Sequence, residues 1–245
     1  MDLNSIAFIS CLACVAFCYA AVGHGGASGY IAVFVLFGMV SPSMKSFVLL
    51  MNLAVASISF YQYYIQGHFN LKYFIPFGLG AMPMAYIGAG FKIDTHIYQY
   101  LLAGFLLFSV VYLSGYLELF QHHFQLHYNQ WRALILAMLL GFISGIIGVG
   151  GGIFLSPILL IFGWQNVKQT AAIAALFIVL NSLAGLFALN DLKLLIDQEL
   201  ISKLLIVTVF GYLGSKWGVK IENIKLLKRM LALVLLIAAY KLCIF

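Results

Sequence analysis

Charged side chains are scarce in this sequence. Asp, Glu, Lys and Arg make up 8% of the 245 residues, and hydrophobic residues make up 64%. Because a soluble domain carries about 25% charged residues, this composition excludes an ordinary soluble fold and indicates an integral membrane protein. Two stretches, Leu3 to Met44 and Ala133 to Val167, lack all four charged residue types over 42 and 35 residues. One crossing needs about 20 residues, so each stretch must turn or break within the membrane.

Other features that this sequence lacks restrict the functions it can have. There is no Walker-type phosphate-binding loop, which argues against ATP hydrolysis by this chain. No basic residue precedes the first apolar run, so we expect a structural helix there rather than a cleaved signal peptide. The four cysteines have no spacing that predicts a disulfide, and we expect no cofactor, no bound metal and no enzymatic activity. The net charge of +6 does not indicate nucleic acid binding, because a late basic cluster is typical of a cytoplasmic membrane flank: Lys216, Lys220, Lys225, Lys228 and Arg229.

The apolar runs are continuous, which predicts helices rather than the alternating strands of a membrane barrel. We therefore predict an all-α, polytopic helical bundle, a multi-pass protein of the bacterial inner (plasma) membrane. The predicted segments are 5–22, 27–39, 46–66, 72–91, 97–117, 131–147, 152–163, 169–189, 200–217 and 226–244. Segments 27–39 and 152–163 are short for a full crossing, and we expect half-helices or the return arms of re-entrant hairpins.

A glycine-rich break interrupts each uncharged stretch. Gly23-His-Gly-Gly26 precedes the first short segment, and Gly148-Val-Gly-Gly151 precedes the second, 125 positions later. Leu36-Phe37-Gly38 matches Ile161-Phe162-Gly163 at the same offset. A further match, at an offset of 126, pairs Ala85–Gly88 with Gly211–Gly214. Each half holds five segments, an odd number, so the second half would enter the membrane in the opposite sense, as in an inverted-topology repeat.

The predicted organisation is a first membrane repeat (1–117), an inter-repeat loop (118–130) and a second membrane repeat (131–245). In the loop, His123 and His127 are four residues apart, a spacing that suits a metal site. No third ligand of Cys or acidic type stands beside them, so we favour a solvated loop. If the basic cluster is cytoplasmic, both termini face outward. The expected partners are a small anionic substrate and the lipid bilayer, and a homodimer is left open.

A long motif in the second half resembles a known family. The run Gly141-Phe-Ile-Ser-Gly-Ile-Ile-Gly-Val-Gly-Gly-Gly-Ile-Phe-Leu-Ser-Pro157, followed by the alanine-rich Ala171–Ala175 and by Asn181-Ser182, is similar to the sulfite exporter TauE/SafE family. The resemblance covers nearly the whole chain and implies a small permease for sulfite, sulfoacetate or a related organosulfur anion. The first-half break departs from the family's pattern, because His24 and Ala27 stand at an apolar and a glycine position.

The two breaks suit an oxyanion on physical grounds as well. A helix N-terminus offers unpaired N–H groups and about half a unit of positive charge, and glycine lets the backbone approach a ligand closely. We therefore predict that both breaks meet near the membrane midplane and that the protein is a secondary transporter of a small sulfur-containing oxyanion such as sulfite or an organosulfonate. The predicted substrate-binding residues are Gly23, His24, Gly25, Gly26, Ser28, Asn52, Gly148, Gly150, Gly151, Gly152, Ser156, Asn181 and Ser182.

Some of these residues have a second interpretation. His24, the only histidine in the first uncharged stretch, suits a proton or anion site as well as a neutral side chain bonded to backbone. Asn52 suits an interhelical hydrogen bond equally well. For the nearby glycines Gly141 and Gly145, four residues apart, we favour close helix packing. We also favour packing for the stripe Cys11, Cys14 and Cys18 over a soft-metal or substrate site.

Two other functions compete with anion transport. Gly26-Ala27-Ser28-Gly29 fits the Gly-x-Ser-Gly pattern of rhomboid proteases, with Ser28 as nucleophile and His24 as base. That reading leaves the second break unexplained. A metal-ion transporter would want acidic residues within the membrane. Every acidic residue falls outside or at the edge of the predicted segments: Asp2, Asp94, Glu118, Asp191, Asp197, Glu199 and Glu222.

Overall fold

The computed structural model describes residues 3–39, 44–91, 93–116, 126–190 and 198–221, together with Leu236 and Tyr240. Within these ranges the regular structure is helical and no strand occurs, which confirms the all-α prediction. The helices are α1 (Leu3–Ala21), α2 (Ala27–Leu36), α3 (Met44–Ile65), α4 (Leu71–Gly90), α5 (Thr95–Leu113), α6 (Gln130–Ile147), α7 (Gly152–Ile161), α8 (Val167–Leu189) and α9 (Gln198–Gly218). Most of the loop 118–130 and of the predicted segment 226–244 lies outside the described residues.

The longer helices begin at short polar side chains that cap their free N–H groups. Asn70, Asp94 and Asn129 accept backbone hydrogen bonds at the starts of α4, α5 and α6. Asn166 forms a capping box with Gln169 at the start of α8. By contrast, α2 and α7 begin at a left-handed glycine and have no side-chain cap from that residue. The first N–H groups of these two helices therefore need acceptors from elsewhere.

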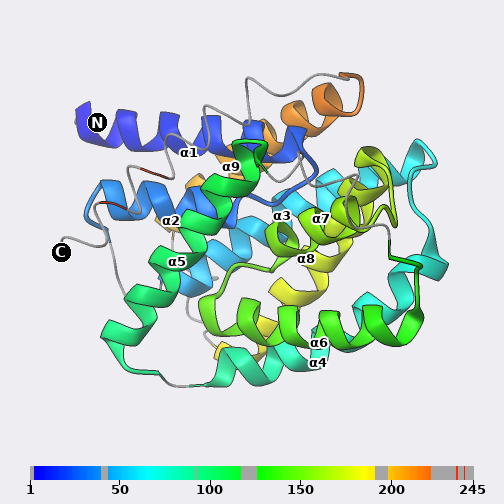
Figure 1. Cartoon of the computed structure of the whole chain (residues 1–245). Helices are drawn as coiled ribbons and strands as arrows, with labels where there is room; N and C mark the ends of the chain where they lie inside the picture. The colour runs from blue at the N-terminus through cyan, green and yellow to red at the C-terminus, as the bar shows by residue number, and fades with distance from the viewer. Residues whose placement is uncertain are drawn as a thin grey trace.

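Three layers of paired helices form the bundle (Figure 1). The antiparallel pair α3 and α8 lies in the middle, with Leu49 against Gly185 and Asn52 against Ser182. The parallel pair α1 and α9 packs on one side, and the parallel pair α4 and α6 packs on the other. Both α4 and α9 also contact this middle pair, α4 through α8 and α9 through α3.

Glycine brings the outer pairs into backbone contact. Gly141 and Gly145 of α6 lie against the Ala81 and Ala85 carbonyls of α4, where a side chain would collide. The prediction of close helix packing for these two glycines is confirmed. Gly214 and Gly218 of α9 contact the backbone of α1 in the same way. Such close approach is how helices associate in lipid, where burial of apolar surface gives no driving force.

Three of the described helices, α3, α6 and α8, are by length and composition apolar enough to cross a membrane. In contrast, α2 and α7 have ten residues each, about 15 Å at 1.5 Å per residue, which is half of a hydrocarbon core of about 30 Å. The N-terminus of α2 lies beside Asn52, and that of α7 lies beside Ile178. Both neighbours occupy the middle of a long helix, so the two short helices start at half depth.

The two short helices end earlier than predicted. Segments 27–39 and 152–163 were each expected to be longer, but α2 ends at Leu36 and α7 at Ile161. Gly38 and Gly163 have positive φ values of 71° and 66°, and a left-handed glycine closes a helix. The same cause shortens the predicted segment 97–117, because Gly115 (φ 86°) follows the end of α5 at Leu113.

Candidate functional site

The first break connects α1 to α2 through two left-handed glycines. Gly23 (φ 77°) ends α1, and Gly26 (φ 100°) directly precedes α2. The backbone N–H groups of Gly23 and His24 donate to the Ala20 and Tyr19 carbonyls over 3.0 and 2.9 Å. Gly25 lies against the Asn52 side chain so closely that a Cβ atom would collide with it. Glycine at these positions is therefore needed both for the turn and for the approach to α3.

The second break repeats this geometry between α6 and α7. Gly148, Gly150 and Gly151 have φ values of 83°, 70° and 74°, and α7 begins at Gly152. The predicted break in the run Gly150–Gly152 is thus confirmed. Lys45 of α3 donates to the Ile146 carbonyl over 2.9 Å, and Tyr98 of α5 donates to the Ile147 carbonyl over 3.1 Å. These two side chains satisfy carbonyls at the C-terminal end of α6, where a positive charge is favourable.

Asn52 joins the two breaks. Its Oδ1 atom accepts a hydrogen bond from the Ala27 backbone N–H at the start of α2 over 3.2 Å. Its Nδ2 group donates to the Val149 carbonyl of the second break over 3.4 Å and to the Ser182 hydroxyl of α8 over 3.0 Å. The residue is 1% exposed. Asn52 therefore caps α2 from another helix while it holds the second break in place.

Asn181 has a related position on α8. Its Nδ2 group donates to the Gly150 carbonyl over 3.3 Å and to the Ser144 hydroxyl over 3.4 Å. Its Oδ1 atom is buried and has no hydrogen-bond partner among the described residues. A buried amide oxygen without a partner costs about 1–3 kcal/mol, so this atom can accept a hydrogen bond from a ligand or water.

The two serines of the site are bonded to side chains from neighbouring segments. Ser28 of α2 and the Tyr19 hydroxyl lie 2.6 Å apart. Ser156 of α7 donates to the Gly152 carbonyl over 3.0 Å and lies 3.0 Å from His24 Nε2. The bond between His24 and Ser156 crosses from the first break to the second half-helix, so the two breaks are linked at a second point besides Asn52.

His24 is 4% exposed, and its contacts depend on its protonation. Nδ1 lies 3.0 Å from the Val22 carbonyl, which can only accept, so Nδ1 carries a proton. In the neutral ring Nε2 is then an acceptor and needs the single proton of the Ser156 hydroxyl. In the cationic ring Nε2 donates, and Ser156 keeps its proton for the Gly152 carbonyl. Protonation of His24 therefore decides whether the Ser156 hydroxyl donates its proton to His24 or to the Gly152 carbonyl at the start of α7.

Eight backbone N–H groups face no protein acceptor at the two helix starts. In the described part of the chain, no hydrogen bond is found for the N–H groups of Gly25, Gly26, Ser28, Gly29, Gly150, Gly151, Gly152 and Ile153. Buried N–H groups are rarely left without a partner in native proteins. Two sets of donors at half depth are what a small oxyanion needs.

Two small cavities flank His24. One, of about 20 Å³, lies between His24, Tyr112, Ser156 and Thr170, and the Thr170 hydroxyl beside it is buried without a partner in the described chain. The other, of about 10 Å³, is lined by the first break, Asn52 and residues of the second break and its neighbours. Each holds about one water molecule. In this conformation the described cavities beside His24 are thus too small for a sulfur oxyanion.

The predicted residues gather at this place with two exceptions. Eleven of them lie in the breaks, bond to a break residue, or bond to Tyr19 or Asn52 beside the breaks. Gly23 and Gly148 lie at the outer ends of the breaks, against Ala171 and Lys45, so they shape the turns from outside.

Cys11 and Cys14 are exposed and only Cys18 is buried, so the cysteine stripe does not line the site. Lys45 was not predicted as a site residue, because a lysine at the start of a membrane helix is typical of the membrane–water interface.

Comparison with known proteins bears on the same conclusion. The sequence model of the sulfite exporter TauE/SafE family matches residues 8–242. The chain is 29% identical to the probable membrane transporter protein y4hK of Sinorhizobium fredii, over 99% of both chains. No solved structure matches the chain significantly. The family match covers nearly all of the sequence, so this multi-pass helical protein of the inner membrane belongs to the sulfite exporter TauE/SafE family of membrane transporters.

Proposed function

We propose that the protein is a secondary transporter of a small sulfur-containing oxyanion such as sulfite or an organosulfonate. The anion binds between the N-termini of α2 and α7. The observation that carries this proposal is the set of eight backbone N–H groups at the two helix starts that have no acceptor within the described part of the chain. Helix N-termini attract anions through these donors and through the helix dipole, with no fixed counter-charge to trap the ligand.

The surroundings of the donors favour an anion over a cation. No acidic residue lines either cavity beside His24, whereas a cation site in a membrane needs carboxylates or many carbonyls. Among apolar neighbours, the polar side chains that line them are one amide, one imidazole and several hydroxyls, from Asn52, His24, Tyr19, Ser28, Tyr112, Ser156 and Thr170. These groups donate hydrogen bonds to oxyanion oxygens and accept them from a protonated anion.

The helix arrangement supports two inverted repeats and alternating access. The parallel pair α1 and α9 corresponds to the parallel pair α6 and α4 if the halves are exchanged, and the contact of α3 with α8 maps onto itself. The C-terminal end of α1 lies beside Tyr63, near the C-terminal end of α3. The N-terminal end of α6 lies beside the N-terminal end of α4, the helix that follows α3 in the chain. Thus α1 and α6 run in opposite directions. Rocking of one repeat against the other would expose the site to each side in turn.

The competing functions find less support. A rhomboid-type protease needs Ser28 and His24 within hydrogen-bond reach of each other. Instead, the Ser28 hydroxyl bonds to Tyr19, and His24 Nε2 bonds to Ser156. The family and the relative are described as an exporter and a transporter, which favours neither a protease nor a metal-ion carrier.

Uptake by proteoliposomes tests the site and the substrate separately. Wild-type protein is assayed with sulfite, thiosulfate, sulfoacetate and sulfate, and we expect at least one sulfur anion to be carried. Gly151→Ala should reduce that flux about tenfold or more, because the new Cβ would press on Ser144 and Phe177 at the start of α7.

Gly163→Ala is the matched control. Gly163 has a similar positive φ of 66°, but no atom lies within 4 Å of a Cβ built there. Both variants carry the strain of a left-handed alanine, about 1–2 kcal/mol, and only one touches the site. Equal flux in the two variants would refute the site. Folded wild-type protein that moves none of the four anions would refute the substrate.

A further inference from the structure

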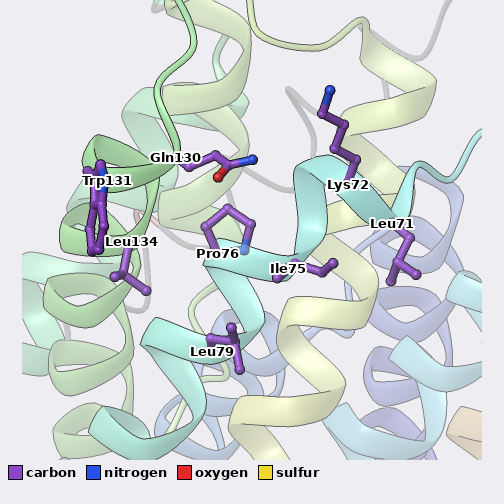
Figure 2. Close-up of a pocket in the computed structure, with 8 residues that line it drawn as sticks. All are labelled: Leu71, Lys72, Ile75, Pro76, Leu79, Gln130, Trp131 and Leu134. Carbon is purple, nitrogen blue, oxygen red and sulfur yellow. The ribbon is translucent and has the colours of Figure 1, made fainter.

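A groove runs between the N-terminal ends of α4 and α6, on the outer face of the bundle (Figure 2). It encloses about 450 Å³ and is lined by Leu71, Lys72, Ile75, Pro76 and Leu79 of α4 and by Gln130, Trp131 and Leu134 of α6. The two cavities beside His24 share none of these residues. The groove is therefore a separate feature, and it is far larger than either cavity.

The groove lies on the N-terminal side of the glycine contacts between the two parallel helices. From Gly80 onward their backbones touch, with Gly80 against the Leu134 carbonyl and Gly141 against Ala81. Before Gly80 the helices lack glycine contacts of this kind, and Pro76 faces the gap. Proline cannot bond to the carbonyl four residues earlier, so the Lys72 carbonyl loses its helical partner at the groove.

Polarity changes along the groove from one end to the other. Lys72, Gln130 and Trp131 lie in the first turns of the helices, and Ile75, Leu79 and Leu134 lie farther in, as Figure 2 shows. Leu71 and Leu79 are eight residues apart, about 12 Å along a helix. Leu79 is 68% and Trp131 74% exposed. A ligand that fits this order has a polar head at the helix ends and an apolar chain that continues toward the membrane interior.

The polar end is positively charged. Lys72 contributes an ammonium group, and the N-termini of α4 and α6 each contribute a partial positive charge. None of the lining residues is acidic. Trp131 is a typical residue of the membrane–water boundary, where its indole N–H meets headgroups. The head of a matching ligand is therefore anionic.

We propose that this groove binds one anionic phospholipid, with its phosphate at Lys72 and an acyl chain along Ile75, Leu79 and Leu134. A second copy of the chain fits less well. A two-fold interface pairs the same surface with itself, so it would bring two Lys72 side chains and four helix N-termini together. The proposal concerns the outer face of the bundle and is independent of the transported substrate.

Lipid quenching of tryptophan fluorescence tests the proposal. Full-length protein is reconstituted in phosphatidylcholine vesicles that contain a small share of brominated phosphatidylglycerol or brominated phosphatidylcholine. The difference in quenching between wild type and Trp131→Phe isolates the signal of Trp131. We expect the brominated phosphatidylglycerol to be favoured at Trp131 by about fivefold, the contribution of one lysine near an anionic headgroup.

Two variants decide the outcome. Lys72→Gln should remove the preference for phosphatidylglycerol, and Lys220→Gln, an exposed lysine away from the groove, should keep it. Equal loss in both variants would show a general surface-charge effect and overturn the proposal. An unchanged preference in Lys72→Gln would also overturn it. If neither brominated lipid quenches Trp131, and crosslinking through the groove yields a dimer, the groove would be an interface with a second copy of the chain instead.

Discussion

At the scale of single residues, His24 provides a proton-dependent bond between the two halves. Only the cationic ring lets Nδ1 donate to Val22, Nε2 donate to Ser156 and Ser156 donate to Gly152 at the same time. A cation there would also attract an anion at the helix starts. Two titratable groups face His24 among the described residues: Tyr112, with ring centroids 6.0 Å apart, and Tyr19 across the second cavity.

Transport should therefore depend on pH through His24. Histidine is the side chain whose charge changes most readily between pH 5 and 8, and a protonated His24 would attract the anion, so uptake should be faster at lower pH. We expect uptake by wild type to change severalfold between about pH 5.5 and 8, and uptake by His24→Gln to stay nearly constant over that range. Initial rates at a series of pH values measure this. A His24→Gln profile parallel to that of wild type would show that the proton acts elsewhere.

Asn52 gives a second prediction at this scale. Asn52→Asp keeps the oxygen that caps α2 but adds a negative charge beside the helix starts. At a separation of about 4 Å and an effective dielectric constant of about 20, two like charges repel by about 4 kcal/mol. The apparent affinity for a sulfur anion should thus fall at least tenfold, measured as the substrate concentration at half-maximal uptake.

The control for Asn52→Asp is Asn190→Asp, at the C-terminal end of α8. Asn190 adopts a left-handed conformation that aspartate tolerates, and it lies outside the breaks. Its affinity for the anion should match that of wild type. Tighter binding of a cation by Asn52→Asp, with anion affinity unchanged, would contradict an anion site.

Sequence patterns predicted part of the site for identifiable reasons. The two glycine-rich runs predicted both breaks, because a packed helix does not need consecutive glycines. The roles of Asn52 and Lys45 depend instead on contacts with residues about 100 positions away, Val149 and Ile146. Spacing along one helix cannot reveal such contacts, so Asn52 was left between two interpretations and Lys45 was not among the predicted site residues.

At the scale of helices, the contact of α4 with α6 should be sensitive to side-chain size. Gly141→Leu would place a side chain into the Ala81 backbone, and overpacking costs about 1–3 kcal/mol or more. We expect a clearly lower midpoint of thermal unfolding in detergent. Gly104→Leu is the control, because no atom lies within 4 Å of a Cβ at Gly104. Equal midpoints for the two variants would contradict the backbone contact.

The loop between α3 and α4 contacts the start of α8, and titration can detect this. Burial, and then the charge of Lys168, lower the pKa of His68 below its ordinary value of 6.5. Lys168→Gln should raise the pKa of His68 toward 6.5 without fully restoring it, because burial remains. NMR of histidine-labelled protein, with His68→Gln for assignment, measures the change. Lys72→Gln should leave the pKa unaltered, and a shift of equal size there would refute the contact.

The helices themselves were well predicted, since uncharged runs and polar flanks mark their positions. The ends were not. Gly38, Gly115 and Gly163 terminate helices by their positive φ, but in a chain with 23 glycines most of the others serve packing or turns. Whether a glycine ends a helix depends on the contacts around it, as the helical Gly141 and the left-handed Gly148 show.

At the scale of the whole molecule, basic residues gather at one end of the bundle. Val219 of the segment after α9 packs with Tyr63 near the end of α3 and with Ala171 at the start of α8. The α3–α4 loop places the start of α4 at this end, and α6 starts beside it. This end therefore contains Lys72, Arg132, Lys168, Lys216 and Lys220. The other end has fewer basic residues: Lys45, near the end of α6, and Lys203, over the Phe8 ring near the start of α1, together with the capping carboxylate of Asp94.

The positive-inside rule then gives an orientation with the starts of α4, α6 and α8 in the cytoplasm and the starts of α1, α3 and α5 outside. Two single-cysteine variants test it, Arg132→Cys and His96→Cys, both at exposed positions at opposite ends, in a chain whose four native cysteines are replaced by serine. A membrane-impermeant maleimide should label His96→Cys in intact cells, and label Arg132→Cys only after the membrane is opened. The reverse pattern would invert the orientation, and it would place the groove at Lys72 in the outer leaflet. The headgroup composition there would then decide which anionic lipid reaches it, because a site at the end of two helices can sample only the leaflet that it faces.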